Sequence, residues 1–269
     1  WSSDVCSSDL KINMIAVCPP ASSNLSEHIS FFEMYKFPYK LIKTIDDIKN
    51  NNDISMILLC GGSNISNSKR DILEFSILEK YYNKIPFIGI CRGLQIAAVY
   101  NNGEISKINN DDHKELYNIS SFHKVIFNNI ETLVNSRHQM MVSKVPKNFE
   151  IIAVSKNDNV PEILLDNKNI FVQFHPERTD MNRLLLKYLF VNYIKKYIYN
   201  KDIFTNMNEY NINKVLSYCY INDYKIVSFK SLKKNMCMSD NDISNILKYN
   251  ANHFKKIKNK KGNDCISLI

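Results

Sequence analysis

The sequence predicts an α/β fold, in which helices flank an open, mostly parallel β-sheet and a small helical domain follows. Apolar runs alternate with helical patterns from residue 11 to residue 102, as they do in strand–helix–strand units. Two of these runs lead into glycine-containing turns, which is typical of parallel strands buried on both faces. Charge is concentrated in the last quarter of the chain, which indicates a second part with a different role.

The amino-terminal half supplies the strands and helices of this predicted sheet. The helix pattern over 69–84 is clear, because apolar side chains recur every three or four residues, at Ile72, Phe75 and Leu78. The expected strands are 11–18, 39–45, 54–62 and 85–90, and the expected helices are 26–37, 69–84 and 91–102. In such sheets ligands bind beyond the carboxyl ends of the strands, where Gly61, Gly62 and Cys91 stand.

The second half is rich in short strands and ends in helices. The expected strands are 103–108, 123–129, 149–155, 162–166 and 169–174, and a helix at 178–198 closes the domain. We therefore expect a catalytic domain at 11–197 and a polar linker at 198–211. Candidate helices at 212–223, 228–236 and 239–257, with a turn and strand at 258–269, resemble a winged helix in a domain spanning 212–269.

Composition restricts the class of protein. The chain has 269 residues, of which 45% are hydrophobic and 23% charged, so it can bury a full α/β core and is not expected to be disordered. Seven cysteines without a CxxC pair suggest a reducing, cytoplasmic setting, and no apolar run reaches a membrane-span length. Residues 1–10 lack the features of a signal peptide, and we interpret them as a non-native scar.

The segment IPFIGICRGLQ, residues 85–95, contains the first candidate for catalysis. The pattern Gly-x-Cys-x-Gly at a strand-to-helix turn is the cysteine form of a nucleophile elbow. Gly89 and Gly93 leave room for the helix to pass close to the strand, and the helix dipole favours a thiolate at Cys91. The backbone N–H of Arg92 can help to bind an oxyanion. A buried structural cysteine is the alternative interpretation of this pentapeptide.

A nucleophilic cysteine needs a base and a group that orients the base. The strand NIFVQF is followed by His175, Pro176 and Glu177. His175 can accept the thiol proton and return it to a leaving amine, while Glu177 can hold the imidazole in the required tautomer. By itself, His-Pro-Glu at a strand end is more often a solvated loop, so the pairing with Cys91 carries the prediction.

Five sequence segments together resemble one family. GICRGLQ, LLCGG and VQFHPE look like the class I glutamine amidotransferases, whose fold is flavodoxin-like. VNSRHQ and NDNVPEILL, together with RDILE after the double glycine, are similar to the γ-glutamyl hydrolase-like branch, such as γ-glutamyl-γ-aminobutyrate hydrolase. The resemblance covers residues 11–196.

The resemblance implies a hydrolase of γ-glutamyl amides with a Cys91–His175–Glu177 triad and a γ-glutamyl thioester intermediate. It also implies an oxyanion hole formed by the backbone of Gly62 and Arg92. Substrate contacts are expected from Gly61, Gln95 and His138, although Gln95 could equally be a polar helix residue and His138 a satisfied loop histidine.

The sequence departs from the family pattern at three places near the expected substrate. Asn64 replaces an Asp after the double glycine, Arg137 replaces the first His of His-His-Gln, and Asn159 replaces the Gly of Asp-Gly-x-x-Glu. None of the three belongs to the expected triad, so hydrolytic chemistry is expected to be intact. The identity of the amine portion of the substrate is left open.

The basic tail carries +6 of the +8 net charge, and its lysines cluster where a wing is expected, at Lys255, Lys256, Lys258, Lys260 and Lys261. Such a cluster favours contact with nucleic-acid phosphates, with a solvated surface or docking to another protein as alternatives. The absence of arginine from this tail weakens the nucleic-acid interpretation.

Two further functions are alternatives to the hydrolase: a glutaminase module that delivers ammonia to a synthetase partner, and a regulatory binding protein. No cofactor or metal is expected, because the chain lacks a P-loop, a GxGxxG motif and metal-ligand spacing.

Overall fold

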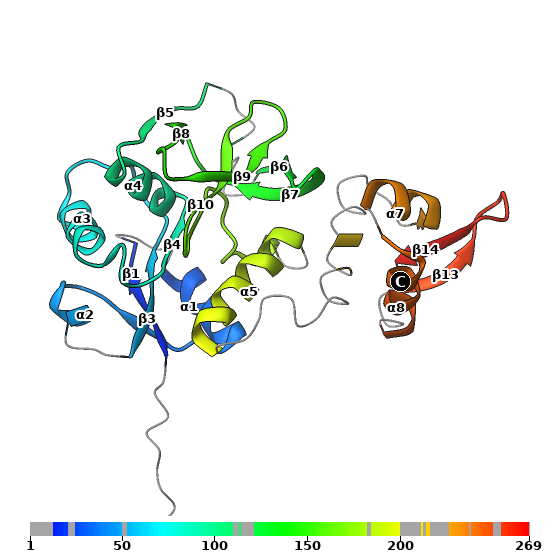
Figure 1. The fold of residues 1–269 in the computed structure, drawn as a ribbon, viewed down its shortest axis with the longest axis horizontal. Coiled ribbons are helices and arrows are strands. Elements are labelled where there is room, and N and C mark those ends of the chain that lie inside the picture. The colour runs from blue at the N-terminus through cyan, green and yellow to red at the C-terminus, as the bar shows by residue number, and fades with distance from the viewer. Residues whose placement is uncertain are drawn as a thin grey trace, which may run out of the picture.

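The computed structural model describes residues 13–20, 25–49, 53–109, 113, 121–181, 184–199, 211, 214–215, 226–236, 238–249 and 254–268. Within these residues the expected α/β fold is confirmed, with one large sheet and helices on both of its faces (Figure 1). The interpreted scar at 1–10 lies outside the described residues. So do most of the linker at 198–211 and most of the candidate helix at 212–223.

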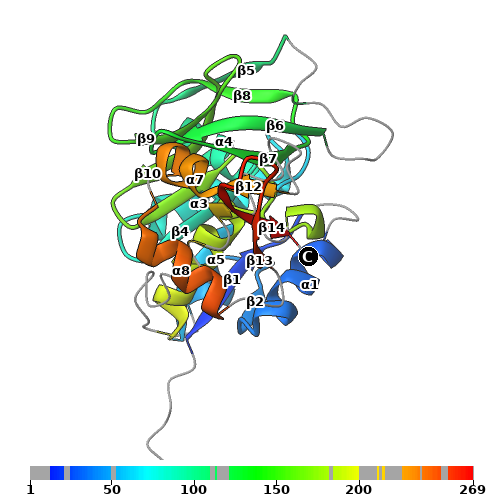
Figure 2. The ribbon, with the colours of Figure 1, turned by 90° about the vertical axis from the view of Figure 1, so that its right-hand side faces the viewer.

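Nine strands of the described chain form the large sheet, in the order β2-β1-β3-β4-β11-β10-β9-β6-β7. The first five are parallel: β2 (Tyr39–Leu41), β1 (Met14–Cys18), β3 (Ile54–Leu59), β4 (Phe87–Ile90) and β11 (Asn169–Val172). The antiparallel strands β10 (Pro161–Asp166), β9 (Glu150–Ser155), β6 (Ser121–Phe127) and β7 (Ile130–Ser136) extend it. In Figure 2, β6 and β7 lie toward one end of the molecule and β1 and β2 toward the other.

Alternating side chains of the parallel strands fill two cores. Ile15 and Val17 of β1 pack on one face with α1 (Leu25–Tyr35) and α5 (Leu185–Tyr199). Ala16 and Cys18 pack on the other face with α2 (Asp46–Lys49), α3 (Lys69–Tyr81) and α4 (Arg92–Tyr100). Figure 1 shows α3 and α4 on one side of the central strands and α5 on the other. Burial of both faces explains why these strands are apolar throughout.

Several predicted elements need correction. The expected helix at 178–198 is a short 3-10 turn, η1 (Thr179–Met181), followed by α5, which begins only at Leu185. The expected strand at 39–45 ends at Leu41, and α2 follows it. The expected strand at 103–108 is β5 (Glu104–Lys107), which pairs with the unpredicted β8 (Met140–Lys144) outside the large sheet. The strand β7 is likewise absent from the sequence-based expectations.

The carboxy-terminal residues form a separate apolar cluster. It contains β12 (Ile226–Ser228), α7 (Phe229–Met236), α8 (Asp240–Tyr249), β13 (Phe254–Lys258) and β14 (Asp264–Leu268). The three strands make an antiparallel sheet in the order β12-β14-β13. The predicted helix at 239–257 is therefore wrong at its end, because residues 254–258 pair with β14 as a strand. Ile130 of β7 packs against this cluster.

No helix among the described residues is long and apolar enough to cross a membrane.

Candidate active site

Cys91 occupies a strained turn at the carboxyl end of β4. Its backbone has φ 52° and ψ −102°, a conformation that L-residues rarely adopt and that costs of order 1–3 kcal/mol. The turn is tight because a Cβ on Gly89 would lie 2.6 Å from the backbone of Gly93, and a Cβ on Gly93 would overlap the carbonyl oxygen of Leu59. The two glycines thus let α4 begin directly against the sheet, with Cys91 at its amino-terminal end.

His175 and Glu177 reach the same place because β11 lies beside β4. Ile90 pairs with Val172, and the backbone N–H of Cys91 donates to the carbonyl of Val172 at 2.7 Å. His175 follows shortly after this strand, and its Nδ1 lies 2.7 Å from Oε1 of Glu177. All three predicted triad residues are buried, with exposures of 6% for Cys91, 7% for His175 and 3% for Glu177.

Cys91 and His175 flank the same point on the double-glycine loop. A Cβ built on Gly61 would lie 3.1 Å from Cε1 of His175 and 3.7 Å from Cβ of Cys91. The Nε2 atom of His175 is buried and has no hydrogen-bond partner among the described residues. It is therefore available to exchange a proton with a thiol or a leaving group.

Charges at this site make the His175 imidazole a stronger base. Burial by itself would lower the pKa of His175, but Glu177 and the thiol of Cys91 raise that pKa well above its ordinary value. Burial would raise the pKa of Glu177, yet His175 and His28 hold it at about 2. His28 contributes from α1, with its Nε2 3.8 Å from Glu177. By contrast, burial raises the pKa of Cys60 well above its usual range, so that thiol is a poor nucleophile.

Hydrogen bonds from the Arg70 side chain hold the double-glycine loop that follows β3. Nη2 of Arg70 donates to the carbonyl of Cys60 at 2.7 Å, and Nη1 donates to the carbonyl of Gly61 at 3.1 Å. These contacts hold two peptide planes of the loop by their oxygens. Gly62 follows with φ 151°, and a Cβ there would collide with the Arg70 guanidinium. Sequence reasoning did not find this role of Arg70.

The side chain of Arg92 has a structural task of its own. It is buried and forms ion pairs with Asp71 and Glu74 of α3, both of which are also buried. The sequence predicted that Ile72 belongs to the buried apolar face of this helix, and that prediction is wrong. Ile72 is 63% exposed, because α3 turns the acidic side chains of Asp71 and Glu74 inward to Arg92. The ion pairs join α3 to the first turn of α4, directly after Cys91.

A cavity of about 170 Å³ opens beside Cys91. It is lined by Gly62, Asn64, Cys91, Gln95, Arg137, His138, Gln139 and Met140. Gln95 and His138, both expected near the substrate, are thus on its wall, and so are two of the three departures from the family pattern. The side-chain amide of Gln95 donates to the carbonyl of Met140 at 3.0 Å.

Two residues that sequence reasoning missed contact the residues of the predicted triad. Asn135 of β7 accepts from the backbone N–H of His175 at 2.9 Å and donates to its carbonyl at 3.1 Å. Gln173 places its amide 3.6 Å from the sulfur of Cys91. Gln173 lies inside the VQFHPE motif, so its position was a usable signal. Asn135 lies inside the VNSRHQ segment, but the contact with His175, 40 residues away, is visible only in the structure.

Comparison with known proteins identifies the family. The model of the family "Glutamine amidotransferase class-I" matches residues 27–195. This chain belongs to the class I glutamine amidotransferase family. The resemblance inferred from the motifs is therefore confirmed at the level of the family.

Curated members of the family include proteins of different function. The glutamine-hydrolysing GMP synthase subunit of Methanocaldococcus jannaschii is 29% identical over 148 residues, covering 53% of this chain and 76% of that protein. The γ-glutamyl-CDP-amidate hydrolase of Campylobacter jejuni is also 29% identical, over 150 residues, covering 52% of this chain and 71% of the hydrolase.

Among solved structures, a protein from Thermoplasma acidophilum described as a candidate subunit of GMP synthase superposes with a TM-score of 0.52. It is 18% identical in sequence, and the match covers 79% of this chain and 98% of that protein. This likeness supports the fold alone.

Proposed function

We propose that the protein hydrolyses γ-glutamyl amides through a thioester on Cys91. One observation carries the proposal. The strained Cys91 lies near a buried His175, and Nδ1 of this histidine lies 2.7 Å from Oε1 of Glu177. Such a nucleophile, base and orienting acid are what acyl transfer from an amide requires. Membership of the amidotransferase family and the γ-glutamyl-CDP-amidate hydrolase relative support it.

The proposed reaction proceeds in two steps. His175 takes the thiol proton, the sulfur of Cys91 attacks the γ-carbonyl carbon, and the C–N bond breaks as His175 returns the proton to the amine. Water, deprotonated by His175, then attacks the thioester and releases glutamate and the thiol. We place the developing oxyanion on the backbone N–H groups of Gly62 and Arg92, because the fixed loop and the start of α4 flank Cys91.

Substrate selectivity is proposed to lie in the wall of the cavity. Arg137 supplies a cation beside Cys91, and a γ-glutamyl group carries an α-carboxylate of opposite charge. Gln95 and His138 provide further polar groups on the same wall.

The test is turnover by the purified chain alone on a panel of γ-glutamyl amides that includes glutamine. We expect release of glutamate from at least one amide and a covalent γ-glutamyl adduct detectable by mass spectrometry. Cys91→Ala should abolish both while its circular dichroism spectrum stays that of the wild type. Substantial turnover by Cys91→Ala would refute the proposal.

A glutaminase module that delivers ammonia to a synthetase partner is the second candidate. It is supported by the glutamine-hydrolysing GMP synthase subunits among the relatives. This candidate predicts that glutamine hydrolysis appears only after a synthetase is added, whereas the first predicts turnover without a partner.

We also propose that a basic winged-helix-like domain follows the catalytic domain and linker. Lys255, Lys258, Lys260 and Lys261 are exposed on or beside β13, while Lys256 forms an ion pair with Asp264 at 2.9 Å. Such a surface suits contact with nucleic-acid phosphates or docking to an acidic protein partner. Alanine at the first four lysines should abolish binding to a DNA duplex at low salt if the surface contacts phosphates, and unchanged binding would exclude that role.

A further inference from the structure

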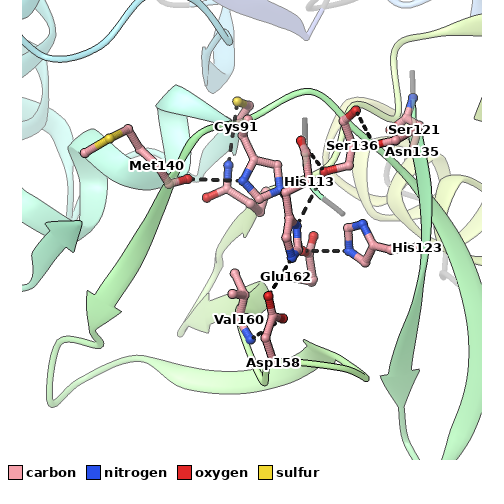
Figure 3. A network of polar contacts seen from close by, with 12 residues as sticks. Cys91, His113, Ser121, His123, Asn135, Ser136, Met140, Asp158, Val160 and Glu162 are labelled. Atoms are coloured by element: carbon pink, nitrogen blue, oxygen red, sulfur yellow. Dashed lines mark hydrogen bonds and ion pairs between the residues drawn. The ribbon is translucent and has the colours of Figure 1, made fainter. Parts of the chain in front are cut away.

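Three histidines surround one buried carboxylate behind the wall of the cavity. His123 lies on β6 and Glu162 on β10, while His138 precedes β8 and His113 lies before β6 in the chain. His113 and Glu162 are fully buried, and His123 and His138 are at most 5% exposed. Figure 3 shows His113 and His123 directed toward Glu162. The mechanism proposed for Cys91 does not require this arrangement.

The distances bring four possible ligand atoms together. Oε1 of Glu162 lies 2.9 Å from Nε2 of His123, 3.7 Å from Nδ1 of His113 and 3.8 Å from Nε2 of His138. Nδ1 of His113 lies 3.2 Å from Nε2 of His138. Ligand atoms of His113, His123 and Glu162 all lie within 4.8 Å of one another.

The outer hydrogen bonds determine which ring nitrogens carry protons. Nε2 of His113 lies 2.9 Å from a carboxylate oxygen of Asp158, and Nδ1 of His138 lies 3.1 Å from the carbonyl of Met140. Because these oxygens only accept, both nitrogens donate, and in the neutral rings the opposite nitrogens present lone pairs. Two lone pairs thus face each other at 3.2 Å beside a carboxylate, which is unfavourable without a cation between them.

The carboxylate is itself incompletely satisfied. Oε2 of Glu162 is buried and has no hydrogen-bond partner among the described residues. The hydroxyl of Ser136 lies near His113 but donates to the backbone carbonyl of His113 at 3.0 Å, so it does not neutralise the cluster.

We propose that this cluster is a binding site for a divalent transition-metal ion, with Zn²⁺ as the expected occupant. Zinc–nitrogen bonds of about 2.0–2.1 Å place tetrahedral ligand atoms roughly 3.3 Å apart. Four of the six separations between the proposed ligand atoms are 2.9, 3.2, 3.7 and 3.8 Å, which lie around that value. Imidazole and carboxylate ligands suit zinc. His113, His123 and Glu162 form the mutually close set, and His138 lies on its far side, next to His113 and Glu162. Asp158 and the carbonyl of Met140 supply the outer-shell acceptors that orient ligating histidines.

The proposed ion would fix one wall of the substrate cavity. His138 and Met140 line that cavity together with Cys91, so a metal bound by His138 would immobilise the segment between β7 and β8. The expectation of no metal site rested on local spacing. The four ligands come from four separate stretches of the chain, and only the tertiary structure brings them together.

The test measures zinc in the full-length chain. Protein purified without a histidine tag is stripped with a chelator, titrated with ZnCl₂ in a competing metal buffer, and assayed by elemental mass spectrometry. We expect one zinc per chain and a raised melting temperature on reloading. His123→Ala should weaken binding by more than about 100-fold, and Asp158→Asn, which keeps all four ligands, by about 10-fold or more. Cobalt substitution should give the strong visible absorption of a tetrahedral site.

The matched control is Cys91→Ala, which removes a thiol beside His175 but no proposed ligand and should bind zinc like the wild type. If the folded wild type binds no zinc, hydrogen bonds between protonated side chains account for the cluster, and the proposal is wrong. Loss of zinc in Cys91→Ala with retention in His123→Ala would place the ion at the triad and also overturn it. If His123→Ala does not fold, Asp158→Asn decides, and wild-type affinity in that variant contradicts the proposal. None of these readouts depends on hydrolytic activity.

Discussion

The charge of Glu177 can be removed almost without changing its shape, by the substitution Glu177→Gln. The amide oxygen of glutamine can still accept from Nδ1 of His175, so the orientation of the imidazole is largely kept. Burial alone would raise the pKa of Glu177, but the surrounding charges, chiefly His175, lower it from 4.5 to about 2. At 1.36 kcal/mol per pKa unit, this corresponds to about 3 kcal/mol favouring the ionised carboxylate.

We expect this loss to appear in the rate. If the carboxylate stabilises the imidazolium formed during acyl transfer, losing about 3 kcal/mol lowers kcat/KM by about 100-fold. Cys91→Ala should fall to background in the same assay, which follows glutamate released from the best γ-glutamyl amide. A Glu177→Gln variant that keeps more than a third of wild-type kcat/KM would refute the reasoning.

The same pair predicts a pH dependence of stability. The pKa of Glu177 is lowered by folding, so its contribution is complete above about pH 4.5 and is lost as pH falls toward 2. The pKa of His175 is raised, so its contribution is complete below about 6.5 and is lost only as pH rises through the higher folded value. In urea unfolding, the stability gap between wild type and Glu177→Gln should be largest near pH 5.5 and shrink by pH 3. An equal gap at both pH values would contradict this assignment.

Three further predictions test the scaffold and the pocket. Gly93→Ala should lower the free energy of unfolding in urea by about 1–3 kcal/mol or more, because the new Cβ overlaps the carbonyl oxygen of Leu59. Wild-type stability of this variant would show that the turn at Cys91 can adjust to a side chain at position 93. Tyr82→Phe should cost about 1.5–3 kcal/mol in the same measurement, because the buried hydroxyl donates to Asp166 at 2.6 Å; a loss below about 0.5 kcal/mol would be inconsistent with that role. Arg137→Ala should raise KM for γ-glutamyl amides about tenfold or more with kcat little changed, and an unchanged KM would remove Arg137 from substrate binding.

Local patterns predicted most of the parallel half of the fold, although they missed α2 and extended β2 by four residues. Strands that are buried on both faces must be apolar throughout, and glycines are required where α4 starts against β4, so both features are visible in the sequence. The antiparallel half was harder. The strand β7 contains the buried polar residues Thr132, Asn135 and Ser136, of which Asn135 and Ser136 hydrogen-bond to distant segments, and this polar composition hid the strand.

The sequence by itself determined the family, the α/β core and the identity of Cys91, His175 and Glu177 as the residues to examine, because each depends on local geometry or on a motif within a few residues. Only the tertiary structure decided what supports them. Arg70 of α3 holds the double-glycine loop that precedes it, and Asn135 holds the backbone of His175 through contacts between distant segments.

The histidine cluster around Glu162 likewise has no local spacing that would indicate it. The physical reason is the same for Asn135 and for the histidine cluster. Buried polar groups must find partners, and in a sheet whose neighbouring strands are far apart in the chain, those partners come from wherever the topology places them.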